Sequence, residues 1–352
     1  MKTSISAMRA AALCAAASFA GCAGGGSPLA PSANRVNVDF SQTLLSPRVA
    51  ISHLGTISAV RQIEPGCCAR AKTLFVSDAF GGSSFTGAVY AFEYPSGKLL
   101  GTLPAPPEGF SEPQGECVDD KGDVYVDNTA LSTIDEYSHG GAFVETLADP
   151  GQFPVNCSFD PSTGNLAVAN IFSSSGGPGN LAIYNGGVLL NTYYPPNTSS
   201  VSAIAYRARS GILWLAVGQS SGVFTYDTFS GGTFAAFTIQ TGKNHLGNGM
   251  QSSALTQSMN ISGTTASGQT AIFQVSAGKI TGKTILDCTG NPSAPCGDVA
   301  FFIKGPRVTV TDAVRLSASM YRFPAGGHPI HVFSASFTQP IGVAVSSFVN
   351  TP

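Results

Sequence analysis

The segment Pro113–Asn128 reads PQGECVDDKGDVYVDN, and the segment Pro154–Asn170 repeats its pattern as PVNCSFDPSTGNLAVAN. Each segment has an apolar run ending in Asp, a turn that contains Gly, and a second apolar run ending in Asn. Such runs, bounded by turn residues, predict two short strands joined by a turn. Each copy then predicts a third and a fourth strand, at Ser132–Tyr137 and Ala142–Leu147 in the first copy and at Asn180–Tyr184 and Val188–Tyr193 in the second.

Weaker copies of this four-strand pattern follow along the chain. One begins at Val201, a degenerate copy lies at about Gln251 to Leu286, and another begins at Gly297. Four short strands in a unit of about 40–50 residues are the signature of a β-propeller blade. The sequence therefore predicts an all-β fold, a six-bladed β-propeller over residues 71–348, with a short tail at 349–352.

The two ends of the repeat region complement each other. Thr73–Asp78 reads as a second strand with no first strand before it, and Pro340–Ser346 reads as a first strand with no second strand after it. Pairing these two segments would complete one blade and remove an exposed sheet edge. We therefore expect the C-terminal strand to close the ring on the N-terminal strands.

The best copies resemble the repeats of secreted bacterial NHL-type six-bladed propellers. Pro113–Asp119 and Gly122–Val126 match the P-x-G-x-x-V-D and G-x-V-Y-V style of that repeat. The resemblance covers roughly residues 70–348 and is weakest in the fifth predicted blade. It implies a fold and not a reaction, since one fold carries many functions and these relatives are largely uncharacterised.

The first 22 residues have the pattern of an export signal. Lys2 and Arg9 precede the uncharged run Ala10–Ala20, which is too short to span a bilayer as a mature helix. The following Cys22 resembles the acylated residue of a bacterial lipobox, although Phe19 stands where Leu is usual. Cleavage after Ala20 and free secretion are the alternative.

Residues 23–70 predict a flexible tether followed by a short segment packed on the propeller. We expect an exported protein of the bacterial cell envelope, in the periplasm or as an outer-membrane lipoprotein, or an extracellular one. A lipid anchor would be its only contact with a membrane.

Six cysteines remain after Cys14 and Cys22 are set aside, and an even number in an exported chain indicates disulfides. Cys117 and Cys157 occupy equivalent positions in neighbouring copies, and Cys288 and Cys296 enclose a turn rich in Gly and Pro. Cys67 and Cys68 would pair with each other or with other cysteines. A zinc site is the alternative, but no paired C-x-x-C spacing supports it.

Composition excludes some functions. Of 352 residues, 11% are charged and the net charge is −2, so the chain lacks the basic excess that phosphate neutralisation needs. We expect no nucleic-acid partner. The segment Gly218–Gly222 (GQSSG) matches the bare G-x-S-x-G pattern, but it lies within the predicted all-β repeat and not at the strand-to-helix turn that a nucleophile elbow needs. No Walker-type loop is present in the sequence.

Polar residues end the second strand of four predicted blades, namely Asp78, Asn128, Asn170 and Asp312. If these ends faced the propeller axis, their oxygens could bind a hard cation such as Ca²⁺. That arrangement is similar to the ion site of gluconolactonase-like propellers. The alternative is that each side chain bonds backbone groups and closes a turn.

Three histidines form a second candidate set: His245, His328 and His331, with Glu116 or Glu136 as partners. Streptogramin-lyase-like propellers pair a His with a carboxylate in a similar way. However, His328 and His331 follow a glycine-rich turn, which predicts an exposed position far from the axis.

These observations predict a monomeric binding module for a protein or a glycan, with no catalytic residues and no cofactor apart from the Ca²⁺ considered above. The alternative is an ion-dependent propeller enzyme of the lactonase or lyase type, with its site in the axial channel.

Overall fold

The computed structural model describes residues 60–64, 66, 72–207, 210–219, 224–253, 258–288, 296–297 and 300–347. The predicted signal, Cys22, Cys67 and Cys68 lie outside the described residues. No helix of the described part is long and apolar enough to cross a membrane.

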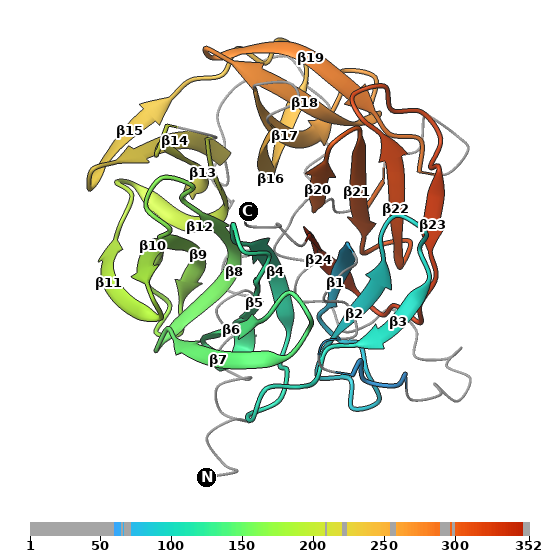
Figure 1. Cartoon of the computed structure of the whole chain (residues 1–352). Helices are drawn as coiled ribbons and strands as arrows, with labels where there is room; N and C mark the ends of the chain where they lie inside the picture. Colours follow the sequence, from blue (N-terminus) through green and yellow to red (C-terminus); the bar gives the residue numbers. More distant parts are fainter. Residues whose placement is uncertain are drawn as a thin grey trace, which may run out of the picture. The chain divides into compact units, whose positions relative to one another are not determined.

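Six antiparallel four-stranded sheets are arranged as the blades of a propeller (Figure 1). Blade 1 contains β1 (Thr73–Asp78), β2 (Ala88–Glu93), β3 (Leu99–Thr102) and β24 (Pro340–Ser346). Blade 2 contains β4 (Pro113–Val118), β5 (Val124–Asn128), β6 (Thr133–Tyr137) and β7 (Phe143–Ala148). Blade 3 contains β8 (Gln152–Phe159), β9 (Leu166–Ser173), β10 (Pro178–Asn185) and β11 (Val188–Tyr193).

The second half of the ring repeats this order. Blade 4 contains β12 (Thr198–Tyr206), β13 (Leu213–Gln219), β14 (Phe224–Ser230) and β15 (Thr233–Phe237). Blade 5 contains β16 (His245–Ser253), β17 (Ser258–Thr264), β18 (Thr270–Ser276) and β19 (Lys279–Ile285). Blade 6 contains β20 (Phe301–Lys304), β21 (Arg307–Asp312), β22 (Ser317–Arg322) and β23 (His331–Phe333).

The C-terminal strand closes the ring, as predicted. β24 pairs with β1 in antiparallel register, with Val345 opposite Leu74 and Val343 opposite Val76. Blade 1 is therefore built from both ends of the repeat region, and its inner strand comes from the end of the chain (Figure 1).

Apolar side chains fill the space between neighbouring blades. In blade 1, Tyr90 and Phe92 on β2 contact Phe337 and Phe333, at ring-centroid distances of 5.2 and 5.4 Å. All four rings are buried in one core cluster between blades 6 and 1. Burial on both faces explains why the second strands read as near-continuous apolar runs.

A disulfide adds a covalent link between two blades. Cys117 on β4 is bonded to Cys157 on β8, with 5.5 Å between their Cα atoms. This confirms the pairing suggested by their equivalent positions in the repeat. A second disulfide joins Cys288 to Cys296 across the local turn.

Candidate ligand-binding groove

The predicted ion ligands Asp78 and Asp312 bond protein groups. The backbone N–H groups of Thr338 and Gln339 donate to the two oxygens of Asp78, each at 2.6 Å. The backbone N–H of Arg315 donates to Asp312 at 2.9 Å, and the Arg315 guanidinium donates to its other oxygen at 2.8 Å. Both oxygens of each carboxyl group accept hydrogen bonds, which agrees with the turn-closing alternative. An ion-binding role for these side chains stays a prediction.

The two asparagines also hold neighbouring segments. Asn128 accepts a hydrogen bond from the backbone N–H of Ser111 at 2.7 Å and donates to the carbonyl of Gly109 at 2.9 Å. Asn170 donates to the Asn180 side chain at 2.9 Å. These contacts position the loop before β4 and the start of β10.

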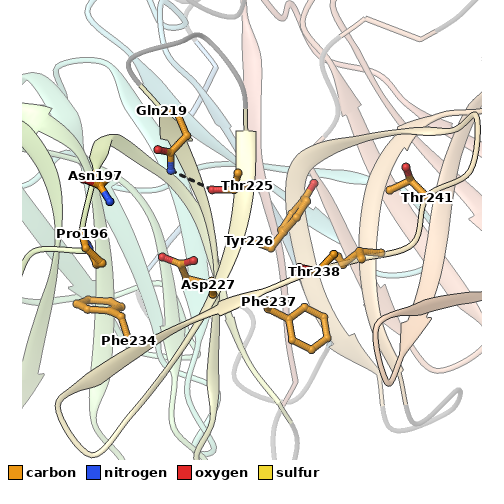
Figure 2. Close-up of a pocket in the computed structure, with 12 residues that line it drawn as sticks. Pro196, Asn197, Gln219, Thr225, Tyr226, Asp227, Phe234, Phe237, Thr238 and Thr241 are labelled. Atoms are coloured by element: carbon orange, nitrogen blue, oxygen red, sulfur yellow. Dashed lines mark hydrogen bonds between the residues drawn. The ribbon is translucent and has the colours of Figure 1, made fainter.

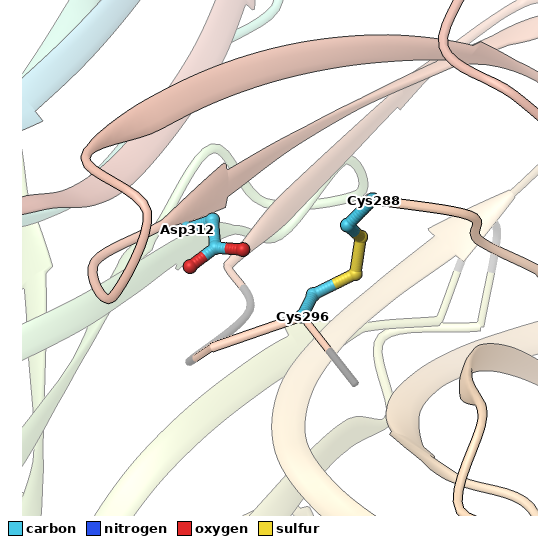
Figure 3. Close-up of side chains that lie close together, drawn as sticks. All are labelled: Cys288, Cys296 and Asp312. Atoms are coloured by element: carbon cyan, nitrogen blue, oxygen red, sulfur yellow. A yellow bond between two sulfur atoms is a disulfide. The ribbon is translucent and has the colours of Figure 1, made fainter. Parts of the chain in front are cut away.

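One trio of His, Cys, Asp and Glu side chains in the described part has ligand atoms within 4.8 Å of one another: Cys288, Cys296 and Asp312 (Figure 3). The two sulfur atoms form a disulfide, so they do not offer thiolate ligands. The trio therefore does not fit a metal site in its oxidised form.

Two of the three histidines lie on the outer part of the propeller, whereas His245 is the first residue of β16, the inner strand of blade 5 (Figure 1). His328 is exposed and its Nδ1 lies 2.8 Å from Asp287. His331 is on β23, the outer strand of blade 6, and its ring contacts Phe333. The glutamates have other partners, since the Ser77 hydroxyl donates to Glu116 and Tyr125 bonds Glu136.

Two buried carboxyl groups have raised pKa values: Glu116, which the sequence suggested only as a histidine partner, and Asp127, which the sequence did not single out. Burial raises the pKa of Glu116 to about 8. Burial, reinforced by nearby Asp149, raises the pKa of Asp127 well above its usual value. Neither oxygen of Asp127 has a hydrogen-bond partner. Both groups are inaccessible between sheets, so we regard them as determinants of stability.

A groove with a volume of about 680 Å³ opens on blade 4 (Figure 2). Its walls combine aromatic rings with amide, hydroxyl and carboxyl groups. The aromatic side chains are Tyr226, Phe234 and Phe237, and the polar ones are Asn197, Gln219, Thr225, Asp227, Thr238 and Thr241.

The β14–β15 hairpin positions most of this wall. Gly231 and Gly232 form its two-residue turn, with φ angles of 57° and 83° that glycine adopts without strain. Phe234 contacts Phe229 at 4.9 Å, while Phe237 contacts Trp214 at 4.2 Å. Ring contacts on both faces of the hairpin therefore hold the aromatic wall in place.

Asp227 is the charged residue of the groove wall. It lies on β14 opposite Ala236 of β15, and its residue surface is 8% exposed. Burial raises the pKa of its carboxyl group, and no donor of the described residues bonds it. Figure 2 shows this carboxyl group on the side of β14 that faces Pro196 and Phe234. A ligand that supplies a donor or a positive charge would satisfy it.

The sequence reasoning did not find this groove. The signal available was the Gly-Gly pair between two runs rich in Phe and Tyr, which predicts a tight hairpin. The contribution of Pro196 and Asn197 from the loop after β11 could not be read from local patterns.

No protein-family model and no curated protein sequence matches this chain. Among solved structures, the chain is similar to a crystal structure of a nidogen/laminin complex, with a TM-score of 0.60. The match covers 78% of this chain and 98% of that chain at 12% identity. At that identity the likeness shows a shared β-propeller fold.

Proposed function

We propose that the chain is an exported binding module that holds a polypeptide partner at the groove on blade 4. The observation that carries this proposal is the combination of a fixed aromatic surface with a carboxyl group, Asp227, that no described residue bonds. Binding sites typically join an apolar lining to a few polar groups that fix orientation. Aromatic residues are also enriched in the cores of protein interfaces.

Two further observations support this proposal. The disulfides are typical of an oxidising, exported environment. The similar propeller named above belongs to a complex between two proteins, nidogen and laminin. In our proposal a signal peptide exports this chain, and acylated Cys22 tethers the propeller to the bacterial envelope.

A glycan is the second candidate ligand. The groove places aromatic rings beside amides, hydroxyls and a carboxyl group, a combination that suits the apolar faces and hydroxyl groups of a sugar. The enzyme alternative would need ion-binding oxygens near the axis, whereas those of Asp78 and Asp312 hold loops.

The test compares capture of envelope and secreted proteins by the tethered wild-type domain and by a Phe234→Ala/Asp227→Ala variant. The matched control is Val332→Ala, because Val332 is an exposed apolar residue on a different outer strand. We expect a specific protein to be retained by the wild type and the control and lost with the groove variant. Equal retention by all three would reject the proposal, and groove-dependent binding on a glycan array instead would favour the sugar.

A further inference from the structure

We propose that the partner binds as an extended strand added to the outer edge of β15, with a basic side chain directed at Asp227. This inference rests on the proposed function and names the chemistry of the partner. Strand addition satisfies unpaired backbone groups at a sheet edge, and side-chain pockets then give specificity.

The backbone of β15 offers a regular free edge. β15 is the last strand of its sheet and pairs with β14 without a register shift. In a two-residue hairpin the pair that flanks the turn exchanges hydrogen bonds, and such pairs then alternate along the ladder. The N–H and C=O groups of Phe234 and Ala236 therefore point away from β14. The Thr228 hydroxyl donates to the carbonyl of Ala235 at 3.2 Å, which agrees with an inward direction for Ala235.

Three of the other outer strands, β3, β7 and β19, are covered, charged or irregular. The edge of β3 is covered by the chain itself, since Ile63 N–H donates to the Thr102 carbonyl at 2.9 Å. β19 carries Lys279 and Lys283 and has a bulge in its pairing with β18, and β7 carries Glu145. Charges and bulges are ordinary ways to block edge pairing.

Within the part of the chain that the structure describes, β15 has none of these protections. Its sequence TFAAF contains no charge and no Pro, and its ladder has no bulge. An unprotected edge is a template for another polypeptide strand. The segment over β3 shows that an extended segment of this chain can cover the outer edge of a blade.

The position of Asp227 favours a basic residue in the added strand of the partner, which we call the guest. Neighbouring strands are about 4.8 Å apart, so a guest residue beside Ala236 would lie about 10 Å from the β14 backbone. The small Ala236 side chain leaves a path between them, and a lysine or arginine can extend along it to Asp227. The groove wall contains no basic side chain that would compete. Phe234 offers an apolar surface to the flanking guest residues.

The direct test uses the fluorescently labelled peptide acetyl-TVKVT-amide and the same peptide with norleucine in place of lysine. Affinity is measured by anisotropy against the wild type and two variants. Ala236→Pro removes an outward N–H and leaves the β14 ladder intact, so we expect at least tenfold weaker binding of both peptides. Asp227→Asn should weaken the lysine peptide about tenfold and leave the norleucine peptide unchanged. Thermal unfolding checks that both variants are folded.

Peptide affinities that neither variant changes, or no binding by the wild type, would overturn strand addition. Failure of this inference is distinguishable from failure of the proposed function. If the captured partner is lost with the Phe234→Ala/Asp227→Ala variant but kept by Ala236→Pro, the groove binds in another mode and only the strand model fails. Sedimentation tests whether the wild type forms dimers and whether Ala236→Pro dissociates them. Such a result would show that a second copy of the chain, and not another partner, occupies the edge of β15.

Discussion

At the scale of single residues, the same side chain can bind an ion or can fix a loop by accepting hydrogen bonds from its backbone. Asp78 ends a strand in a position that suits either role, and the sequence left both open. Its partners, Thr338 and Gln339, lie 260 and 261 residues further along the chain. Only closure of the ring brings those N–H groups to Asp78, so no local pattern could have shown them.

Glu116 gives a prediction for pH dependence. Its folded pKa of about 8 lies above its ordinary value of 4.5, so the folded state keeps a proton that the unfolded state has lost between those values. Stability should therefore fall as pH rises from about 4 to 9, by on the order of 5 kcal/mol from this group. We expect Glu116→Gln to flatten the profile and to be more stable than the wild type at pH 9, as measured by urea unfolding.

The matched control is Glu108→Gln, since Glu108 is exposed. This substitution should leave the pH profile unchanged. The pKa of Asp127 is raised as well, so Asp127 adds to the same loss of stability with rising pH. We therefore expect Glu116→Gln to flatten the profile of stability against pH only in part. A Glu116→Gln profile that parallels the wild type would contradict the assignment.

The disulfide between Cys117 and Cys157 gives a second prediction. It closes a loop with a sequence separation of 40 residues, for which the chain-entropy relation gives about 4 kcal/mol. The Cys117→Ser/Cys157→Ser variant should lose stability of that order in urea unfolding. Adding a reductant should lower the stability of the wild type toward that of the variant. If the unreduced wild type were no more stable than the variant, the stabilising role of this disulfide would be refuted.

At the scale of elements, regular blades were predictable and irregular ones were not. The strands of blade 2 start and end within one or two residues of their prediction, because turn residues bound each alternating run. β16 starts at His245, before the predicted Gln251, since its register shift between Leu246 and Met250 interrupts alternation. The groove escaped prediction because its walls combine strands of blade 4 with the loops before and after this blade.

The hairpin that supports the groove can be tested through its turn. Gly232 has a φ of 83°, so Gly232→Val should cost about 1–2 kcal/mol and loosen β15 locally. We expect hydrogen exchange of the Ala235 amide to accelerate about tenfold while the inner strands stay protected. Gly231→Asn is the control, because Asn-Gly suits a turn with two positive φ angles. Equal exchange in both variants would count against this geometry.

At the scale of the whole molecule, polar side chains on the inner parts of the sheets link neighbouring blades. Asn156 on β8 accepts from the Ile204 N–H at 2.8 Å, and the Thr311 hydroxyl on β21 donates to the carbonyl of Ile341 at 3.0 Å. Each link joins one blade to the next. The stability of a blade therefore depends on its neighbours, and the ring should unfold as a unit.

The closing strand is the strongest test of that dependence. A chain ending at Gln339 lacks β24, so it loses Val343 and Val345 from the core between blades 6 and 1. It also loses the Ser346 hydroxyl that donates to the Gly122 carbonyl and bonds His139. β1 then becomes an exposed edge, which favours aggregation. We expect loss of cooperative urea unfolding.

A chain ending at Ser347 is the matched control for this truncation, because it removes only the last five residues and retains all of β24. It should unfold like the full chain. Adding a synthetic peptide of residues 340–347 to the shorter chain should restore a cooperative transition, since β24 contributes through pairing with β1 and through blade contacts rather than through its covalent link. If the chain ending at Gln339 unfolded at the same urea concentration and with the same slope as the control, closure by β24 would not be what holds the ring together.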